Sequence, residues 1–270
     1  MSSPLNPYRA PEATVMDIRE PGGDIQFQTP AALVDAGRGV SWIGEGWALF
    51  KMAPALWIVA MVILLAIQMV LSFLPLIGNI VSLLIGPLFM AGLLAFAHGL
   101  ASGEEADVGK LFVGFRAKTG ALMSVALLYL VLIVLVFVVA AVAVFVLLGS
   151  ASIFNAADPE AFMMNLMAGT SGLLVLAVVL VALTAIFLIA AAYWFAPGLV
   201  YYTDIGPVAA MKASFAACLR NWLPFLLYSI VGTFVLLGGV LALGIGLLVA
   251  VPVLMASYYA CFRDLFGART

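Results

Sequence analysis

The chain has 270 residues, of which 66% are hydrophobic and only 9% are charged. Ordinary soluble domains are about half apolar and about a quarter charged, so this composition excludes a soluble globular protein. Its 11 basic and 13 acidic residues leave a formal net charge of −2, which argues against nucleic-acid binding. One histidine and two cysteines are too few for a zinc or iron-sulfur site, so we expect no cofactor.

The first 40 residues differ in composition from the rest of the chain. They contain eight charged residues and no apolar run, so no cleavable signal peptide is expected. Prolines and glycines interrupt the segment, and we predict that residues 1–40 form a cytoplasmic, largely disordered tail before a membrane domain at 41–267. Apolar residues at helical spacing, from Leu33 through Ile43 and Trp47 to Phe50, predict a short interfacial helix in front of that domain.

Six apolar runs follow, each long enough for the roughly 20 residues that cross the hydrocarbon of a bilayer. The sequence PLIGN at 75–79 supplies a turn between the first two runs. The apolar residues at 223–262 fit two minimal spans with a turn within 238–246. The chain is therefore predicted to be an all-α polytopic membrane protein of six transmembrane helices, with spans at about 55–74, 80–100, 121–148, 173–202, 223–241 and 244–262.

Basic residues occur only in alternate connections between these spans. Lys and Arg mark cytoplasmic loops, so six spans with both termini in the cytoplasm satisfy all 11 positions. The positions are Arg9, Arg19, Arg38 and Lys51 before the first span, Lys110, Arg116 and Lys118 after the second, Lys212 and Arg220 after the fourth, and Arg263 and Arg269 after the sixth.

Internal repetition suggests how the spans are grouped. Residues 87–100 and 252–265 match in register at Pro, Met, Ala, Ala and Leu. Aromatic and basic residues precede each odd span, and at 208–222 the large apolar residues share one helical face, which predicts an amphipathic helix on the membrane surface. The repeated unit is then a short interfacial helix followed by a transmembrane hairpin, used three times in a stack.

These features resemble a known family. The aromatic entry, the tight hairpin and the ending Tyr258-Tyr259-Ala-Cys-Phe-Arg-Asp-Leu-Phe266 resemble the uncharacterised proteobacterial six-span inner-membrane proteins over roughly residues 41–267. That family is similar in turn to the membrane portion of bacterial glycerophosphodiester phosphodiesterases. The resemblance implies a bacterial inner-membrane location and no established activity. The residues after the last span leave no room for a phosphodiesterase domain, so no catalytic residue carries over.

Few residues could carry chemistry. No predicted span has a charge in its middle, which argues against an ion-coupled transporter. His98 is interpreted as a polar cap at the cytoplasmic interface, with a ligand or pH-sensing role as the alternative. Asp158 and Glu160 resemble a helix start, with acid-base chemistry as the alternative. Cys218 and Cys261 are expected to be reduced, buried thiols.

We therefore expect a non-catalytic inner-membrane module that acts through lipids or partner proteins and is not an enzyme. The alternative is a translocator that moves a lipid or an apolar solute through a groove between hairpins. The partners left open are membrane lipids, a second copy of the chain and another membrane protein. The predicted lipid or partner surface on the cytoplasmic side consists of Lys51, Arg116, Lys118, Lys212, Arg220, Trp222, Tyr258, Tyr259 and Arg263.

Overall fold

The structure, a computed structural model, describes residues 26–148 and 170–268. Six helical segments in these residues are long and apolar enough to cross a membrane, which confirms the predicted all-α polytopic fold class. In chain order the elements are β1 (Gln26–Phe27), α1 (Arg38–Met52), α2 (Pro54–Ser72), α3 (Ile77–Ala101), the 3-10 helix η1 (Val108–Phe115), α4 (Thr119–Leu148), α7 (Thr170–Trp194), α8 (Ala196–Tyr202), α9 (Pro207–Arg220), α10 (Trp222–Leu241), α11 (Leu247–Phe266) and β2 (Gly267–Ala268).

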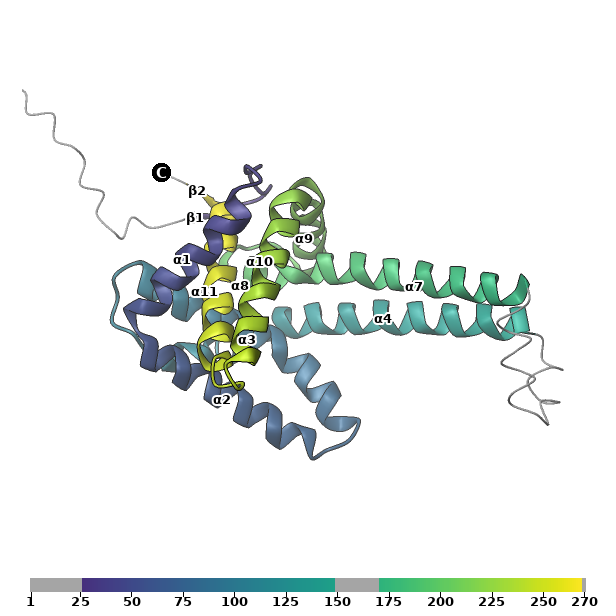
Figure 1. Ribbon diagram of the computed structural model, residues 1–270, viewed down its shortest axis with the longest axis horizontal. Helices are drawn as coiled ribbons and strands as arrows, with labels where there is room; N and C mark the ends of the chain where they lie inside the picture. Colours follow the sequence, from purple (N-terminus) through teal and green to yellow (C-terminus); the bar gives the residue numbers. More distant parts are fainter. Residues whose placement is uncertain (1–25, 149–169, 269–270) are drawn as a thin grey trace, which may run out of the picture.

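Three pairs of helices extend from a common centre (Figure 1). We call this centre the hub; it comprises α1, η1, α8, α9, and the parts of α3 and α11 that begin at Pro87 and Pro252. The first arm is α2 with the start of α3, the second is α4 with α7, and the third is α10 with the start of α11. The chain turns between α10 and α11 within residues 238–246, as the sequence indicates.

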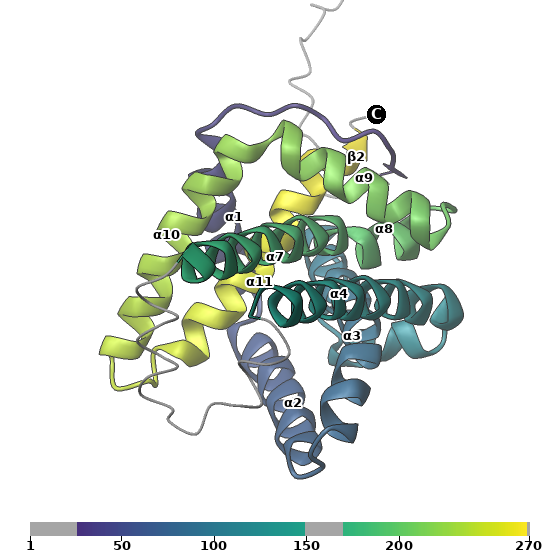
Figure 2. The ribbon, with the colours of Figure 1, turned by 90° about the vertical axis from the view of Figure 1, so that its right-hand side faces the viewer.

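The arms diverge instead of stacking. In Figure 1 the second arm runs crosswise to α10 and α11, and Figure 2 shows it directed toward the viewer while the other two arms descend. The expectation of stacked hairpins is therefore wrong. The reason is that each arm is attached to different parts of the hub: α4 and α7 pack against α3, α8 and α9, whereas α10 packs mainly against α1 and α11.

The hub is closely packed because glycines let helix backbones approach one another. A Cβ atom added to Gly46 of α1 would lie 2.6 Å from the backbone nitrogen of Ser257 and the carbonyl oxygen of Val253, both in α11. Large side chains fill the remaining space, and Trp42, Phe96, Phe195 and Phe262 are among those that are fully buried. Such interiors approach the packing density of organic crystals.

The second arm meets the hub at a break between α7 and α8. The Ser214 hydroxyl of α9 accepts a hydrogen bond from the backbone nitrogen of Phe195 at 2.9 Å and donates one to the carbonyl of Ala191 at 2.7 Å. A side chain inserted into the helical ladder in this way bends a helix, and Pro197 at the start of α8 favours the same break. At the other joint Lys118 has a positive φ of 55°. The second arm runs crosswise to α10 and α11 (Figure 1). If α10 and α11 cross a flat bilayer, α4 and α7 can cross the same bilayer only when the second arm tilts strongly or changes its angle at these two joints.

The predicted apolar face of α9 is divided in the structure. Val208 and Leu219 are about half exposed, as side chains that face a membrane surface would be, whereas Met211 is buried. Small residues, including Ala210, Ser214 and Ala217, make most of the face that packs against neighbouring helices. Only small side chains allow α9 close enough to α7 for the Ser214 hydroxyl to reach Ala191.

Residues 26–37, which the sequence assigns to the disordered tail, lie across the hub as an extended strap. Strand β1 pairs antiparallel with β2, and the backbone nitrogens of Gln28 and Ala32 donate to the carbonyls of Phe266 and Leu265. The backbone N–H and C=O groups of the strap form hydrogen bonds with residues that are distant in the sequence. The local sequence does not reveal these partners. Residues 1–25 lie outside the described residues.

Candidate functional site

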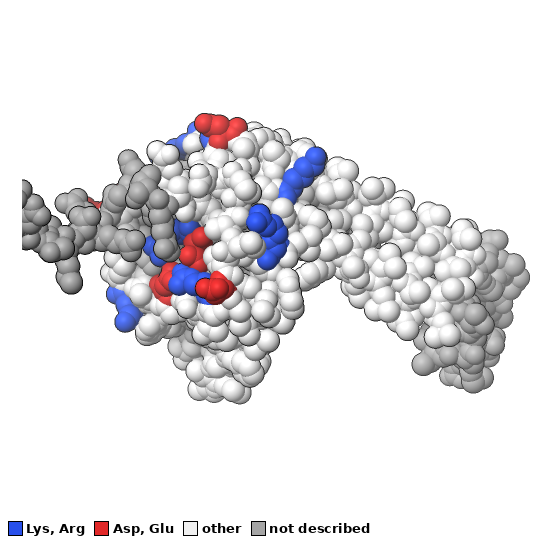
Figure 3. All heavy atoms as spheres, turned by 90° about the horizontal axis from the view of Figure 1, so that it is seen from above, with Lys and Arg blue, Asp and Glu red and all other residues white. Residues whose placement is uncertain are grey.

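Charged side chains of the described residues are confined to the hub and the connections beside it. None of the Lys, Arg, Asp or Glu residues in this part of the chain lies in α2, α4, α7 or α10. In Figure 3 the blue and red atoms gather over the hub, while the projecting second arm is white on the visible face. Pairing of β1 with β2 brings the two described ends of the chain to the same side of the hub. We call the surface formed by the charged side chains of the hub and the adjoining connections the charged face; it includes Lys51, Arg116, Lys212 and Arg220.

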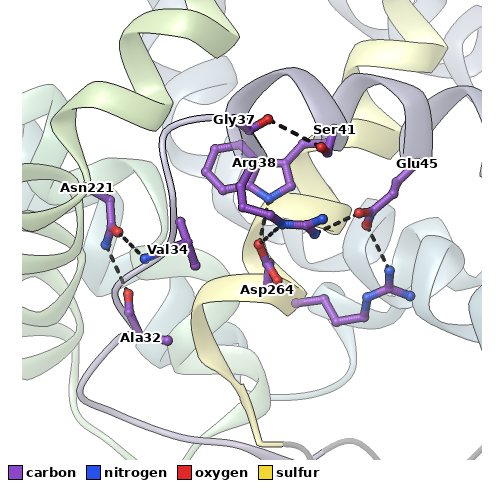
Figure 4. Close-up of polar contacts among 10 residues, drawn as sticks. Ala32, Val34, Gly37, Arg38, Ser41, Glu45, Asn221 and Asp264 are labelled. Carbon is purple, nitrogen blue, oxygen red and sulfur yellow. Dashed lines mark hydrogen bonds and ion pairs between the residues drawn. The ribbon is translucent and has the colours of Figure 1, made fainter.

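A network of two cations and two acids fastens α1 to α11 at the charged face (Figure 4). The Arg38 guanidinium contacts Asp264 and Glu45, each at 2.7 Å, and Arg263 donates to Glu45 at 3.0 Å. The indole N–H of Trp42 donates to Asp264 at 3.0 Å. The hydrogen bond to Asp264 is the main reason that the pKa of Arg38 is raised. The four charges compensate one another, so this network stabilises the hub and adds little net charge to its surface.

The predicted cationic residues fall into two groups. Arg263 contacts Glu45 at 3.0 Å, and Lys118 donates to the carbonyl of Thr203 at 2.7 Å and lies 3.2 Å from Asp204. Their charges are thus partly compensated. The other four are exposed, and within the described residues no ion pair joins them to an acid; they are Lys51, Arg116, Lys212 and Arg220.

The three predicted aromatic residues do not share one location. Trp222 is 62% exposed at the start of α10, which agrees with a place on the surface. Tyr258 and Tyr259 are 5% and 0% exposed, so they do not lie on a surface and are removed from the candidate site. The Tyr258 hydroxyl donates to the carbonyl of Trp194 at 2.6 Å. Its burial is thus accompanied by the hydrogen bond that a buried tyrosine normally requires.

His98 belongs to an aromatic cluster inside the hub. Its Nδ1 lies 2.8 Å from the Tyr259 hydroxyl, and its ring contacts those of Phe27 and Tyr202. Phe27 comes from the strap and also contacts Phe262, so the strap adds a side chain to the hub interior. These contacts place the His98 ring among aromatic side chains of the strap, α8 and α11, with the Tyr259 hydroxyl as its polar partner.

Sequence reasoning missed the residue that holds the strap. Asn221, between α9 and α10, accepts a hydrogen bond from the backbone nitrogen of Val34 and donates one to the carbonyl of Ala32, both at 3.0 Å (Figure 4). Its side chain is buried, and the two contacts resemble a rung of a β-ladder. The available signal was a single amide between an amphipathic segment and an apolar run, which has no specific structural meaning by itself.

The remaining candidates give no catalytic arrangement. Cys218 and Cys261 are free thiols, and burial raises the pKa of Cys218 to about 12, which keeps it protonated and unreactive at neutral pH. Among the described residues no group of three His, Cys, Asp or Glu side chains could hold a metal ion. Asp158 and Glu160, considered for a helix start or acid-base chemistry, lie outside the described residues.

Comparison with known proteins supports a membrane assignment and no particular activity. The chain is 27% identical to a protein of Burkholderia thailandensis named as a probable inner membrane protein, in an alignment that covers 87% of this chain and 93% of that protein. No protein-family profile matches the chain. No solved structure matches it. The similarity to phosphodiesterase membrane portions is not supported by these comparisons.

Proposed function

We propose that this chain is a non-catalytic protein of the bacterial inner membrane that acts through anionic lipid headgroups or a partner at its charged face. The similarity to a probable inner membrane protein along most of both chains supports the location. The observation that carries the role is the group of four exposed cations, Lys51, Arg116, Lys212 and Arg220, which no described acid neutralises.

The position of these cations suits the surface of a cytoplasmic leaflet. They lie on α1, after η1 and on α9, each beside the base of an apolar arm. Lys51 also lies over the ring of Trp47 at 6.0 Å, and Trp222 adds an exposed ring near Arg220 in the sequence. Amphipathic aromatic rings and basic side chains are enriched together at the headgroup level of membranes. The proposed orientation has both termini in the cytoplasm.

Spin-labelled lipids in nanodiscs test the proposal. The full chain with Lys51, Arg116, Lys212 and Arg220 all changed to Gln should lose most of its preference for labelled phosphatidylglycerol over phosphatidylcholine. Each cation near the surface contributes up to about 1 kcal/mol, and salt weakens the effect. The control removes two ion pairs whole, Lys110→Gln with its partner Glu104→Gln and Lys118→Gln with its partner Asp204→Asn, so the net charge does not change and the preference should be retained. An unchanged preference in the fourfold variant would contradict the lipid role and leave the partner role.

A second candidate is a translocator of a lipid or an apolar solute. The observation in its favour is a groove of about 360 Å³ between α2, α3 and α11, lined mainly by apolar side chains of the first arm. Saturable flux of a fluorescent lipid across liposomes that contain the chain, lost on the change Gln68→Leu, would favour this candidate over the non-transporting one.

A further inference from the structure

The groove between α2, α3 and α11 contains one polar pair at its rim. Its walls include Met61 and Leu64 of α2, Phe89 of α3 and Val251 of α11. Its volume of about 360 Å³ is within the range of roughly 300 to 1,000 Å³ that is usual for small-molecule sites. All three helices are candidate membrane spans, so the material that fills the groove comes from the bilayer.

The polar pair is Gln68 of α2 and Ser82 of α3. The Ser82 hydroxyl donates a hydrogen bond to Oε1 of Gln68 at 3.0 Å. The amide nitrogen of Gln68 carries two further donors, and within the described residues no acceptor is hydrogen-bonded to it. An unsatisfied donor in hydrocarbon costs several kcal/mol, and little water reaches this depth to satisfy it. The acceptor must therefore be supplied by a molecule outside the chain.

The depth of Gln68 indicates what that molecule is. α2 has 19 residues, which gives a length of about 28 Å and matches the roughly 30 Å of hydrocarbon in a bilayer. Gln68 is four residues from the end of α2 at Ser72, so it lies about 6 Å inside the boundary. The ester carbonyls of a glycerolipid, which are acceptors without donors, lie at this boundary. Met61 and Phe89 continue the groove toward the bilayer centre, along the path of an acyl chain.

We infer that the groove binds a diacyl glycerolipid from the leaflet that faces the turn between α2 and α3. One ester carbonyl accepts a hydrogen bond from Nε2 of Gln68, and the acyl chain lies against Met61, Leu64, Phe89 and Val251. The site is on the first arm, away from the four cations of the charged face. It requires neither the proposed headgroup role of those cations nor any transport, so it can fail or hold independently of the proposed function.

Native mass spectrometry of the full chain in detergent tests the inference with two lipids that differ only in the linkage. One is a diester phosphatidylethanolamine and the other is its diether analogue, which has the same headgroup and chains but no carbonyl oxygen. The wild-type chain should bind the diester at least about fivefold more tightly, since the diester supplies about one neutral hydrogen bond that the diether lacks. The Gln68→Leu variant should lose this preference and should bind both lipids with the affinity that the wild type has for the diether.

The matched control is Thr184→Val in α7, which removes another polar group from a span. The Thr184 hydroxyl donates to the carbonyl of Leu180 at 2.8 Å, so it already has a partner, and the variant should keep the diester preference. Equal affinity of the wild type for the two lipids would overturn the inference. So would a preference that persists in Gln68→Leu or that Thr184→Val removes equally. The comparison of lipids on the wild type remains decisive even if a variant folds poorly.

Discussion

Helices α4 and α11 are both long enough to cross a membrane, but their surroundings are opposite. None of the most apolar stretch of α4 is buried in the chain, whereas 56% of the corresponding stretch of α11 is buried. α4 is also the more hydrophobic of the two and has no charged residue, whereas α11 contains Arg263 and Asp264. The polar groups of α11 have partners in the hub, such as Trp194 for Tyr258 and Glu45 for Arg263.

The difference in burial and polarity between α4 and α11 reflects what each helix contacts. A helix that presents most of its surface to lipid must be apolar on that surface, because the hydrocarbon offers no partner for a polar group. A helix packed against protein can carry polar side chains if neighbouring helices satisfy them. The hub is thus the part of the molecule whose stability depends on specific contacts, and the arms are the part that depends on the bilayer.

The largest expected effect comes from removing a large side chain from the hub. Phe262 is fully buried against Phe27 and Phe195, so Phe262→Ala should lower the free energy of unfolding in mixed micelles by about 3 to 5 kcal/mol. Phe137→Ala in α4, where the ring is 61% exposed, should change it by less than about 1 kcal/mol. Unfolding by sodium dodecyl sulfate, followed by circular dichroism, measures both. Similar losses for the two variants would break the contrast between hub and arm.

Two glycines of α1 give a sharper comparison, because one is packed against α11 and the other is not. Gly46→Ala places a Cβ atom 2.6 Å from the α11 backbone and should cost about 2 kcal/mol, because the two helices must separate. Gly44→Ala meets nothing within 4 Å and should be neutral or stabilise by up to about 1 kcal/mol through helix propensity. The same unfolding experiment checks both. If Gly46→Ala were as well tolerated as Gly44→Ala, the close contact of α1 with α11 would be refuted.

A smaller effect is expected at the strap. Asn221→Ala removes the two hydrogen bonds to Val34 and Ala32, and the loss should be about 1 to 2 kcal/mol. Amide exchange at residues 26–34 should accelerate much more than exchange in α11, because only the strap is released. Hydrogen exchange with mass spectrometry reads both segments at once. An unchanged rate in the strap would show that Asn221 does not hold it.

The arms were predictable from the sequence because helices that are exposed to lipid have a recognisably apolar composition. A continuous apolar run such as that of α4 has a single interpretation at this length, and the turn between α10 and α11 followed from the limited number of apolar residues. The strap was not predictable, since Asn221 and Ala32 are 189 positions apart and neither has a distinctive neighbourhood. Local periodicity cannot report such pairings.

The candidate site shows the same division. The exposed cations Lys212 and Arg220 were identified because charged residues are rare in this apolar chain and lie in the connections between the predicted spans. Tyr258 and Tyr259 were misassigned to the surface because an aromatic residue near a span end resembles a membrane-belt residue. Their burial depends on packing by α3, α7 and the strap, which composition does not reveal.

The central claim is that the arms cross the membrane from a hub whose charged face is in the cytoplasm. Labelling of single cysteines with an impermeant maleimide, in a chain without Cys218 and Cys261, tests it most directly. In intact cells Asn79→Cys and Asp158→Cys should react, whereas Glu105→Cys and Lys212→Cys should react only after permeabilisation. Reaction of position 212 in intact cells, or protection of position 79, would contradict the account.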